Sequence, residues 1–459
     1  MRSHTGYAIF LAGTAALGGF LFGFDSAVIN GAVGGIQQGF ASSNAGTGFA
    51  VASILLGCAA GALVAGRLAD RWGRRLVMIA CAVVFALTAV WAGGAASATQ
   101  FTIARLASGL GVGAASVVCP AYIAEISPAR LRGRLASLQQ LGIVIGIFAA
   151  LQSDEWLARI AGGVSSPLWD GGEAWRWMFY VEVVPSLLFG LAVLAVPESP
   201  RYLVAVGQES RALAVLRRIE PSTPDGEIAD IRRTVEADRP PQLADLRDPA
   251  GGVRRIVWIG VGLSVLQQFV GINTIFYYGS VLWSVAGFTQ ADSLKLNVLT
   301  GVINVASTLV AMAFVDRAGR RPLLLWGSAG MAVTLGALAF AFSMAGEGEG
   351  GRLVLSGPIA GLALVAANLY VIAFGISWGP CVWILLGEMF PNRIRGAAMA
   401  VAVFAQWMAN WLVTVTFPPI VSSMKPTGAY AIYFAFAVVS FFFVRQWVDE
   451  TRGKTLEEM

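Results

Sequence analysis

The chain has 459 residues, of which 56% are hydrophobic and only 13% are charged, and its mean hydropathy is +0.69. Because soluble domains carry about 25% charged residues, this composition excludes a soluble globular protein, a disordered chain and a coiled coil. The single histidine, His4, excludes histidine-based metal sites, Ser-His triads and histidine proton relays. The four cysteines lie inside apolar stretches and indicate no disulfide framework. The composition therefore indicates a multi-pass protein of the lipid bilayer.

Apolar runs long enough to cross a bilayer recur along the whole sequence. A membrane-spanning helix needs roughly 20 mostly apolar residues. The first run contains Asp25 and lacks a small-residue cleavage site, so we interpret it as a membrane helix and not as a signal peptide. The predicted fold class is an all-α membrane protein with twelve transmembrane helices, near residues 8–30, 48–66, 77–97, 100–124, 134–153, 176–196, 256–283, 292–314, 322–344, 356–386, 396–417 and 428–447.

The positive charges are distributed unevenly between the predicted loops. If the N-terminus is cytoplasmic, 26 of the 32 Lys and Arg residues fall in cytoplasmic segments, five fall outside and one lies within a span. This asymmetry predicts that both termini are cytoplasmic. It also accounts for the net charge of +5, which we therefore do not interpret as nucleic-acid binding.

One long polar interval separates six predicted spans from the other six. It opens at Glu198-Ser-Pro-Arg201, where Ser199 can cap a helix and Pro200 suits the first helical turn. Short amphipathic patches within the interval predict helices on the cytoplasmic face. The predicted organisation is a six-helix repeat over 1–198, a cytoplasmic helical linker over 199–253, a second six-helix repeat over 254–448 and a cytoplasmic tail over 449–459.

Two unrelated motifs occur once in each half of the chain. The first is Asp70-Arg-Trp-Gly-Arg-Arg75 after the second span and Asp316-Arg-Ala-Gly-Arg-Arg321 after the eighth. The second is Glu125-x-x-Pro-x-x-x-Arg132-Gly at the end of the fourth span and Glu388-x-x-Pro-x-x-x-Arg395-Gly at the end of the tenth. Their recurrence in the same order predicts two parallel repeats about an axis along the membrane normal, with substrate bound between them near mid-membrane.

Further segments carry a family signature. They are Gly23–Asn30, Gly66–Arg74, Arg105 with its Gly-rich helix, Pro197–Arg201, Gln267-Gln-Phe-Val-Gly-Ile-Asn273, Gly379-Pro-Cys-Val-Trp383 and Glu450–Lys454. With these segments the chain resembles, over nearly its whole length, the sugar porter family of the major facilitator superfamily, in particular its bacterial proton-coupled glucose and xylose symporters. The Asp-Arg-x-Gly-Arg-Arg element is common to many facilitators, whereas the Gln-Gln element combined with Pro-Glu-Ser-Pro-Arg is more specific. The resemblance implies the major facilitator fold and sugar transport by alternating access.

Uncharged amides inside apolar spans are suited to a sugar, because its hydroxyls both donate and accept hydrogen bonds and amides do the same without a charge. Such amides can also serve only to join helices. Gln267, Gln268 and Asn273 cannot share one ideal helical face, but a helix break at Gly271 would remove that restriction. The resemblance maps the following amides onto sugar-contact positions, with Asn410 a weaker candidate: Gln140, Gln267, Gln268, Asn273, Asn304 and Gln406.

Aromatic residues are expected to complete the sugar site. Trp383 follows a predicted helix break at Gly379-Pro380 and is expected to cover the apolar face of the sugar ring. Xylose carriers of the family tend to have Gln and Leu where this chain has Ile147 and Phe276, so the resemblance favours D-glucose. The remaining candidates for the wall or gate, half of which can be ordinary packing residues, are Phe20, Phe276, Tyr277, Tyr278, Phe374 and Trp407.

Three ionisable residues, Asp25, Arg105 and Glu182, fall within predicted spans, in the outer half of the first repeat. Charges there are costly and usually functional, although a purely structural ion pair remains an alternative. Passive members of the family tend to carry Asn at the position of Asp25, and proton-coupled members carry Asp. We therefore expect an Asp25–Arg105 pair near Glu182 to couple transport to the proton, with no cofactor.

Charged residues also cluster at the cytoplasmic ends of the spans. They can be ordinary positive-inside charge and helix caps. Because they occur as pairs in both halves, we expect an interhelical salt-bridge latch that closes the cytoplasmic side in the outward-open state without contacting sugar. The residues of this predicted latch are Arg71, Glu125, Arg132, Glu198, Arg317, Glu388 and Arg395.

The function predicted from these features is proton-coupled symport of a small neutral sugar, D-glucose by preference, by a monomer in a bacterial plasma membrane. Bacterial origin is favoured by 29 Arg against 3 Lys and by the lack of an Asn-x-Ser/Thr site. A passive sugar uniporter remains an alternative. A sugar sensor is disfavoured because only about a dozen residues follow the last span, and an enzyme because the sequence offers no nucleophile–base pair and no metal cluster.

Overall fold

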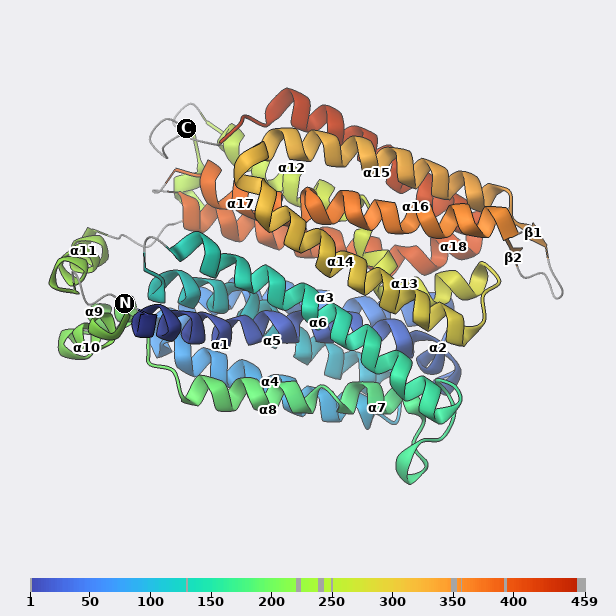
Figure 1. The fold of residues 1–459 in the computed structure, drawn as a ribbon, viewed down its shortest axis with the longest axis horizontal. Coiled ribbons are helices and arrows are strands. Elements are labelled where there is room, and N and C mark those ends of the chain that lie inside the picture. The colour runs from blue at the N-terminus through green and yellow to red at the C-terminus, as the bar shows by residue number, and fades with distance from the viewer. Residues whose placement is uncertain are drawn as a thin grey trace.

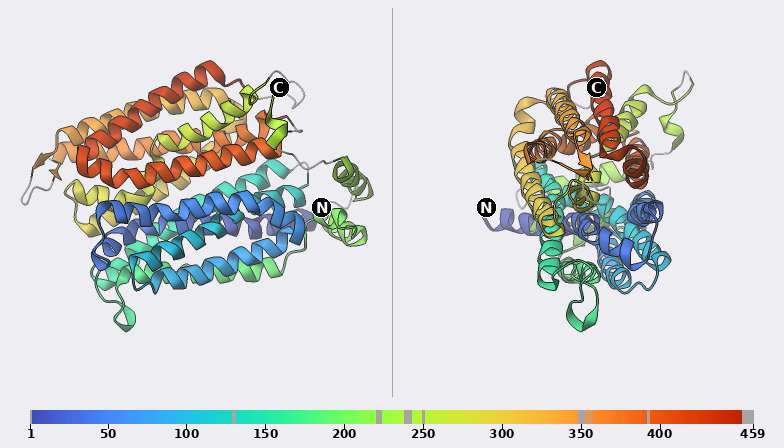
Figure 2. Two further views of the ribbon diagram at one scale, coloured as in Figure 1. Left: turned by 180° about the vertical axis from the view of Figure 1, so that it is seen from behind. Right: turned by 90° about the vertical axis from the view of Figure 1, so that its right-hand side faces the viewer.

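The computed structural model describes residues 2–128, 131–219, 224–237, 243–248, 251–347, 353–355, 357–391 and 394–451. These residues form two bundles of long helices that lie side by side, with the first half of the chain in one bundle and the second half in the other (Figure 1). The view from behind shows the same division (Figure 2). The predicted all-α membrane fold is confirmed.

Among the described residues, the first bundle contains six apolar units long enough to cross a membrane. The first and last units are each interrupted and are built from two successive helices. The helices of this bundle are α1 (Arg2–Ala27), α2 (Ile29–Gly39), α3 (Asn44–Trp72), α4 (Arg74–Gly93), α5 (Ala98–Ile126), α6 (Arg132–Ala161), α7 (Ala174–Tyr180) and α8 (Val183–Leu194), with the 3-10 turn η2 (Trp169–Gly171) before α7.

The second bundle contains five further apolar helical runs within the described residues. The last of these is 53 residues long, but Lys425 has φ 59° and ψ 169°, which divides it into two helices just before Pro426. With that division the predicted twelve spans are confirmed. The helices of this bundle are α12 (Arg255–Phe269), α13 (Ile272–Val285), α14 (Gln290–Ala318), α15 (Arg320–Ser343), α16 (Gly357–Ile376), α17 (Trp378–Met389) and α18 (Arg395–Trp447).

The segment between the bundles forms short helices at one end of the molecule. These are α9 (Pro200–Ala205), α10 (Glu209–Ile219), α11 (Pro224–Ala237) and the 3-10 turn η3 (Leu243–Leu246). The hydroxyl of Ser199 accepts a hydrogen bond from the Tyr202 N–H and Pro200 is the first residue of α9, as the sequence predicts. We call this end, where the N-terminus also lies, the terminal end (Figure 1).

The opposite end, which we call the far end, carries α2, α7 and the hairpin of β1 (Gly346–Glu347) and β2 (Leu353–Val354) (Figure 1). The two bundles touch through α3 against α18, α6 against α14 and α2 against α13. Within the first bundle, α1 lies so close to α6 that a Cβ on Gly23 would be 1.9 Å from the Ile143 carbonyl oxygen. Such close backbone contact through glycine is typical of membrane helices, and it holds α1 and α6 side by side.

Candidate functional site

A cavity lies between the two bundles, and helices of both bundles line it. Most residues that the sequence predicts to contact sugar converge on this cavity, although they come from α6, α12, α13, α14, α16, α17 and α18. The predicted residues that line it are Gln140, Ile147, Gln267, Gln268, Asn273, Asn304, Trp383, Gln406, Phe276 and Phe374, together with Tyr277, Trp407 and Asn410.

Four of the amides form a connected network on one side of the cavity. The Asn273 Nδ2 donates to Gln268 Oε1 at 2.6 Å, and Gln268 Nε2 donates to Gln267 Oε1 at 3.2 Å. The same Gln267 oxygen accepts from Gln406 Nε2 at 2.7 Å. The network is possible because Gly271 has φ 83° and separates α12 from α13, so that Asn273 at the start of α13 is turned back toward the glutamines. The helix break considered from the sequence is therefore present.

Other polar groups at the cavity have no hydrogen-bond partner in the described protein. The side chains of Gln140 and Asn304 make no such bond, and Gln406 Oε1 and Trp407 Nε1 are buried without one. Buried polar groups are almost always paired in native proteins. Unpaired donors and acceptors around one space therefore indicate that it receives a polar, uncharged molecule or ordered water.

The aromatic candidates divide into those inside and those outside the cavity. Trp383 lines it, but the helix break before this residue lies at Ser377, not at Gly379-Pro380, because proline is tolerated in the first turn of α17. Phe20 does not line the cavity, and its ring stacks on Phe24 with 6.1 Å between centroids. Tyr278 also lies outside it, where its hydroxyl donates to the Thr414 carbonyl oxygen at 3.1 Å.

Several cavity residues were not predicted from the sequence. Thr308 lies one helical turn after Asn304 on α14, and Ile143 and Val144 share a face of α6 with Gln140. A search at helical spacing from the predicted amides would have found these three residues. Ser26 follows Asp25 and also lines the cavity; its position next to a buried acid was the available signal.

Asp25 and Arg105 form the predicted ion pair, with both side chains 1% exposed. Arg105 Nη1 binds Asp25 Oδ1, and Arg105 Nη2 donates to the Asp25 carbonyl oxygen at 3.0 Å. The Ser108 hydroxyl donates to the other carboxylate oxygen of Asp25. Because Ser108 follows Arg105 by three residues on α5, both donors face the carboxylate from one helix face. Ser108 was not predicted.

Glu182 is buried where α7 joins α8, and its Oε1 has no hydrogen-bond partner among the described residues. It interacts electrostatically with both Asp25 and Arg105. The three ionisable residues that the sequence places within spans thus lie in one neighbourhood. This arrangement holds two carboxyl groups near a single guanidinium, so one carboxyl can take up a proton without leaving the arginine unpaired.

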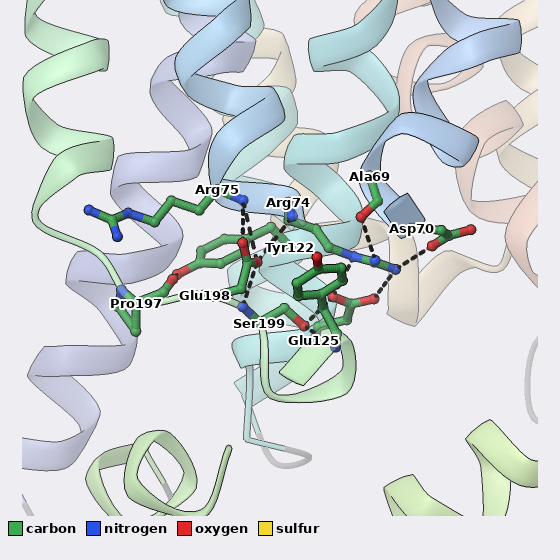
Figure 3. A network of polar contacts seen from close by, with 10 residues as sticks. Ala69, Asp70, Arg74, Arg75, Tyr122, Glu125, Pro197, Glu198 and Ser199 are labelled. Carbon is green, nitrogen blue, oxygen red and sulfur yellow. Dashed lines mark hydrogen bonds and ion pairs between the residues drawn. The ribbon is translucent and has the colours of Figure 1, made fainter. Parts of the chain in front are cut away.

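A polar network lies at the terminal end of the first bundle (Figure 3). Arg74 lies 3.0 Å from Glu125 between Nε and Oε2, and it also pairs with Asp70. The Glu198 carboxylate accepts from the backbone N–H groups of Arg74 and Arg75 at the start of α4. Burial raises the pKa of Glu198, and these N–H groups act in the opposite direction. The predicted Glu125 and Glu198 therefore belong to one network.

The second bundle repeats this network at its own terminal end. Arg320 Nη2 donates to Glu388 Oε1 at 2.9 Å, and the Arg320 and Arg321 N–H groups donate to the carboxylate of Glu450. The Thr451 hydroxyl donates to Glu388 at 2.6 Å. Gly73 and Gly319 have φ of 90° and 87° and make the two equivalent turns. Each network joins helices of one bundle only, among the residues that the structure describes.

The arginines of these networks differ in part from those predicted. Arg74 and Arg320, which follow the glycine turns, bind the glutamates; Arg71 precedes the first turn and is exposed. Arg317, also exposed, precedes the second turn. The guanidinium of Arg395 donates to the Phe390 carbonyl oxygen at 3.2 Å. The side chain of Arg132 lies outside the described residues.

The two bundles are joined at the far end by Asn30 of α2. Its Nδ2 donates to the Phe276 carbonyl oxygen at 3.0 Å, and its Oδ1 accepts from the Ser280 N–H and from Asn297 Nδ2, both at 2.9 Å. The Ser280 hydroxyl donates to the Asn30 carbonyl oxygen. We call this set of bonds the far-end contact. It was not predicted, because its residues are about 250 positions apart.

Comparison with known proteins agrees with this architecture. A family model described as "Sugar (and other) transporter" matches residues 11–459. The chain is 52% identical over 454 residues to a glucose transport protein of Synechocystis sp., covering 99% of this chain and 97% of that protein. It is 35% identical over 489 residues to the D-xylose-proton symporter of Escherichia coli K12, covering 99% and 96%.

Solved structures of the E. coli xylose transporter XylE share the fold. Its partially occluded inward-open conformation gives a TM-score of 0.85 at 34% identity and covers 98% of this chain and 100% of that chain. XylE bound to 6-bromo-6-deoxy-D-glucose gives a TM-score of 0.82 at 36% identity and covers 99% and 98%. The match to the family model spans both bundles and the cavity between them, and the resemblance first seen in the motifs is confirmed. The chain belongs to the sugar porter family of the major facilitator superfamily.

Proposed function

We propose that this protein is a proton-coupled monosaccharide symporter of a bacterial plasma membrane, with D-glucose as its substrate. The proton is the coupling ion, and the protein works as a monomer by alternating access without a cofactor. The relatives named above support this proposal, since one is a glucose transport protein and another a D-xylose-proton symporter. Because the chain belongs to a family of transporters, we do not propose an enzymatic role.

One observation carries the proposal: the buried ion pair adjoins the amide-lined cavity. Asp25 forms the pair with Arg105, and the next residue, Ser26, lines the cavity. A change of charge on Asp25 therefore acts on a helix that also borders the substrate. When Asp25 is protonated its attraction to Arg105 is lost, and α1 and α5 are held together less strongly. This loss can bias which end of the molecule opens.

The cavity wall supports glucose over xylose. Ile147 and Phe276 give it an apolar edge at the two positions where xylose carriers of the family tend to have Gln and Leu. The unpaired amides of Gln140 and Asn304 can each both donate to and accept from sugar hydroxyls. A neutral sugar satisfies these groups without bringing a charge into the cavity.

We propose that the terminal end is cytoplasmic and the far end is external, with the repeats bounded at 1–198 and 254–448, the linker at 199–253 and the tail at 449–459. The charge asymmetry of the loops supports this orientation. α8 ends at Leu194 and α12 begins at Arg255, which agrees with these bounds. The two terminal-end networks then face the cytoplasm, and we propose that they help to close that side in the outward-open state.

The proposal is tested with the purified protein in proteoliposomes. Uptake of labelled D-glucose should exceed equilibrium when the outside is acidified and should return to equilibrium when a protonophore removes the gradient. Uptake that ignores the gradient would make the protein a passive uniporter. Counterflow against a panel of unlabelled competitors identifies the sugar, and D-glucose should compete more strongly than D-xylose.

A further inference from the structure

A second buried carboxyl group, Asp154, has a different environment from Asp25. It lies near the far end of α6 and its side chain is fully buried. Its Oδ2 accepts a hydrogen bond from the Gly31 N–H at 3.1 Å, whereas its Oδ1 is buried with no hydrogen-bond partner in the described part of the chain. The contact with α2 is close, since a Cβ on Gly31 would lie 2.6 Å from the Asp154 Cβ.

Several charged groups on α6 and on the helices around it are already paired with one another. The elements packed against α6 are α1, α2, α5, α7 and α14. Among the residues that the structure describes, none of their cations forms an ion pair with Asp154. The pairs that the charged groups form instead are Glu155 with Arg159 on α6, Glu173 with Arg176 on α7, Asp292 with Lys295 on α14, and Asp25 of α1 with Arg105 of α5.

An ionised Asp154 would therefore be a buried charge with one hydrogen bond and no counter-ion. Such a charge is strongly unfavourable, and a buried group in this position usually becomes neutral instead. Protonation of Oδ1 removes the charge and leaves Oδ2 free to accept from Gly31. The geometry around Asp154 thus suits the carboxylic acid and not the carboxylate.

Asp154 is also linked to the far-end contact between the bundles. Gly31, which binds it, is the residue after Asn30, whose side chain joins α2 to α13. Separation of α2 from α13 would break the far-end contact and let water reach the neighbouring helix ends. In water the carboxylate is well solvated, so Asp154 can lose its proton only when this end is open.

We propose that Asp154 is a second proton-binding site, whose protonated form stabilises the closed far end. The proton passes from external water to the Asp154 Oδ1 as the far end closes, and it returns to external water when the far end opens. The proton that is transported remains assigned to Asp25. Asp154 instead makes closure of the far end sensitive to external pH and not to the proton gradient across the membrane. The direction of this effect rests on the proposed orientation, in which the far end is external.

The test measures opening of the far end directly. Exposed Ala45 on α3 and Ala291 on α14 are replaced by Cys and spin-labelled, and the distance between the labels is measured in nanodiscs from pH 5.5 to 8.5, without sugar. An Asp25→Asn background removes titration of the first site.

With Asp154 present, the closed-to-open ratio should fall as pH rises, by at most about tenfold per pH unit for one proton. In Asp154→Asn the amide replaces the neutral acid, so the ratio should favour the closed form at every pH.

Glu155→Gln is the matched control, because this neighbouring carboxyl already pairs with exposed Arg159. The Glu155→Gln variant should keep the pH dependence of the closed-to-open ratio. Equilibrium sugar binding shows that each variant is folded. A pH dependence that survives Asp154→Asn, or one that is absent when Asp154 is present, overturns the proposal. The measurement includes no transport, so a protein that proved to be a uniporter would contradict the proposed function and still give a result for Asp154.

Discussion

Gln267 is the central residue of the amide network. Its Nε2 donates to the Trp378 carbonyl oxygen at 2.8 Å, and its Oε1 accepts from both Gln268 and Gln406. Removal of one such amide leaves sugar hydroxyls and protein groups unpaired when sugar is bound. That loss costs about 1–3 kcal/mol, or roughly 5- to 150-fold in affinity.

We therefore expect Gln267→Ala and Asn273→Ala each to weaken sugar binding within this range, with the fold intact. Equilibrium binding of labelled D-glucose to the purified protein measures the change. The control is Asn368→Ala, since this buried amide bonds to Thr300 and does not line the cavity. Unchanged affinity in both test variants would mean that sugar binds elsewhere.

The apolar edge of the cavity should select the sugar. Phe276→Leu combined with Ile147→Gln makes this edge smaller and more polar, so we expect the xylose-to-glucose preference to rise. Competition in counterflow gives the ratio. Phe20→Leu, on an aromatic residue outside the cavity, should leave the ratio unchanged. If the double variant keeps the original ratio, Ile147 and Phe276 do not select the sugar.

The polar side chains of the cavity were predicted from the sequence much better than the contacts between them. An amide such as Asn304 is conspicuous in an apolar span, and Thr308 could have been added at helical spacing. The bond from Ser108 to Asp25 could not be predicted, because it depends on how α5 packs against α1. Phe20 was misplaced for the same reason: an aromatic residue has no feature that tells the cavity side of a helix from its packed side.

At the scale of elements, two tight turns decide which arginines form the terminal-end networks. Gly73 has φ 90°, a conformation that glycine adopts readily. The turn reverses the chain, so that Arg74 at the start of α4 reaches Glu125 while Arg71 at the end of α3 stays exposed. The motif in the sequence contains both arginines and does not distinguish them, because the choice depends on this reversal.

The two arginines should therefore differ in their effect on stability. Arg74→Ala removes the partner of Glu125. Because both side chains are largely buried, we expect a loss of about 1.5–3 kcal/mol in unfolding free energy. Arg71→Ala should change it by no more than about 0.5 kcal/mol. Denaturation of the solubilised protein compares the two. Equal effects would contradict the assignment of Arg74 as the network residue.

At the scale of the whole molecule, the sequence predicts the twelve spans and their division into two halves, because both depend on local hydropathy and on motifs that recur. The spans built from two helices were harder to predict. The break at Gly271 was anticipated, and the one before α17 was placed two residues late. The breaks between α1 and α2 and between α7 and α8 were not anticipated. The far-end contact lies between helices of different halves, and no local pattern indicates it.

The coupling of sugar to proton also belongs to the whole molecule, since both ends must open in turn. A proton that crosses a potential of about 100 mV delivers about 2.3 kcal/mol. At 1.4 kcal/mol per tenfold change, this energy supports roughly 50-fold accumulation of sugar. Accumulation requires a group that takes up the proton on one side and releases it on the other, and Asp25 is the residue proposed for this step.

Asp25→Asn keeps the size of the side chain but cannot titrate, so we expect it to abolish both accumulation and sugar-driven proton uptake. Sugar binding should survive because the cavity amides are unchanged, and counterflow should persist at least in part because it needs no net proton movement. Paired uptake and counterflow in proteoliposomes with an imposed pH gradient measure both activities, with Glu155→Gln as a carboxyl control.

If Asp25→Asn still accumulates sugar, the coupling group is another carboxyl, and Glu182, buried beside Arg105, is the next residue to test. If the unmodified protein ignores the gradient, Asp25 is only a structural partner of Arg105.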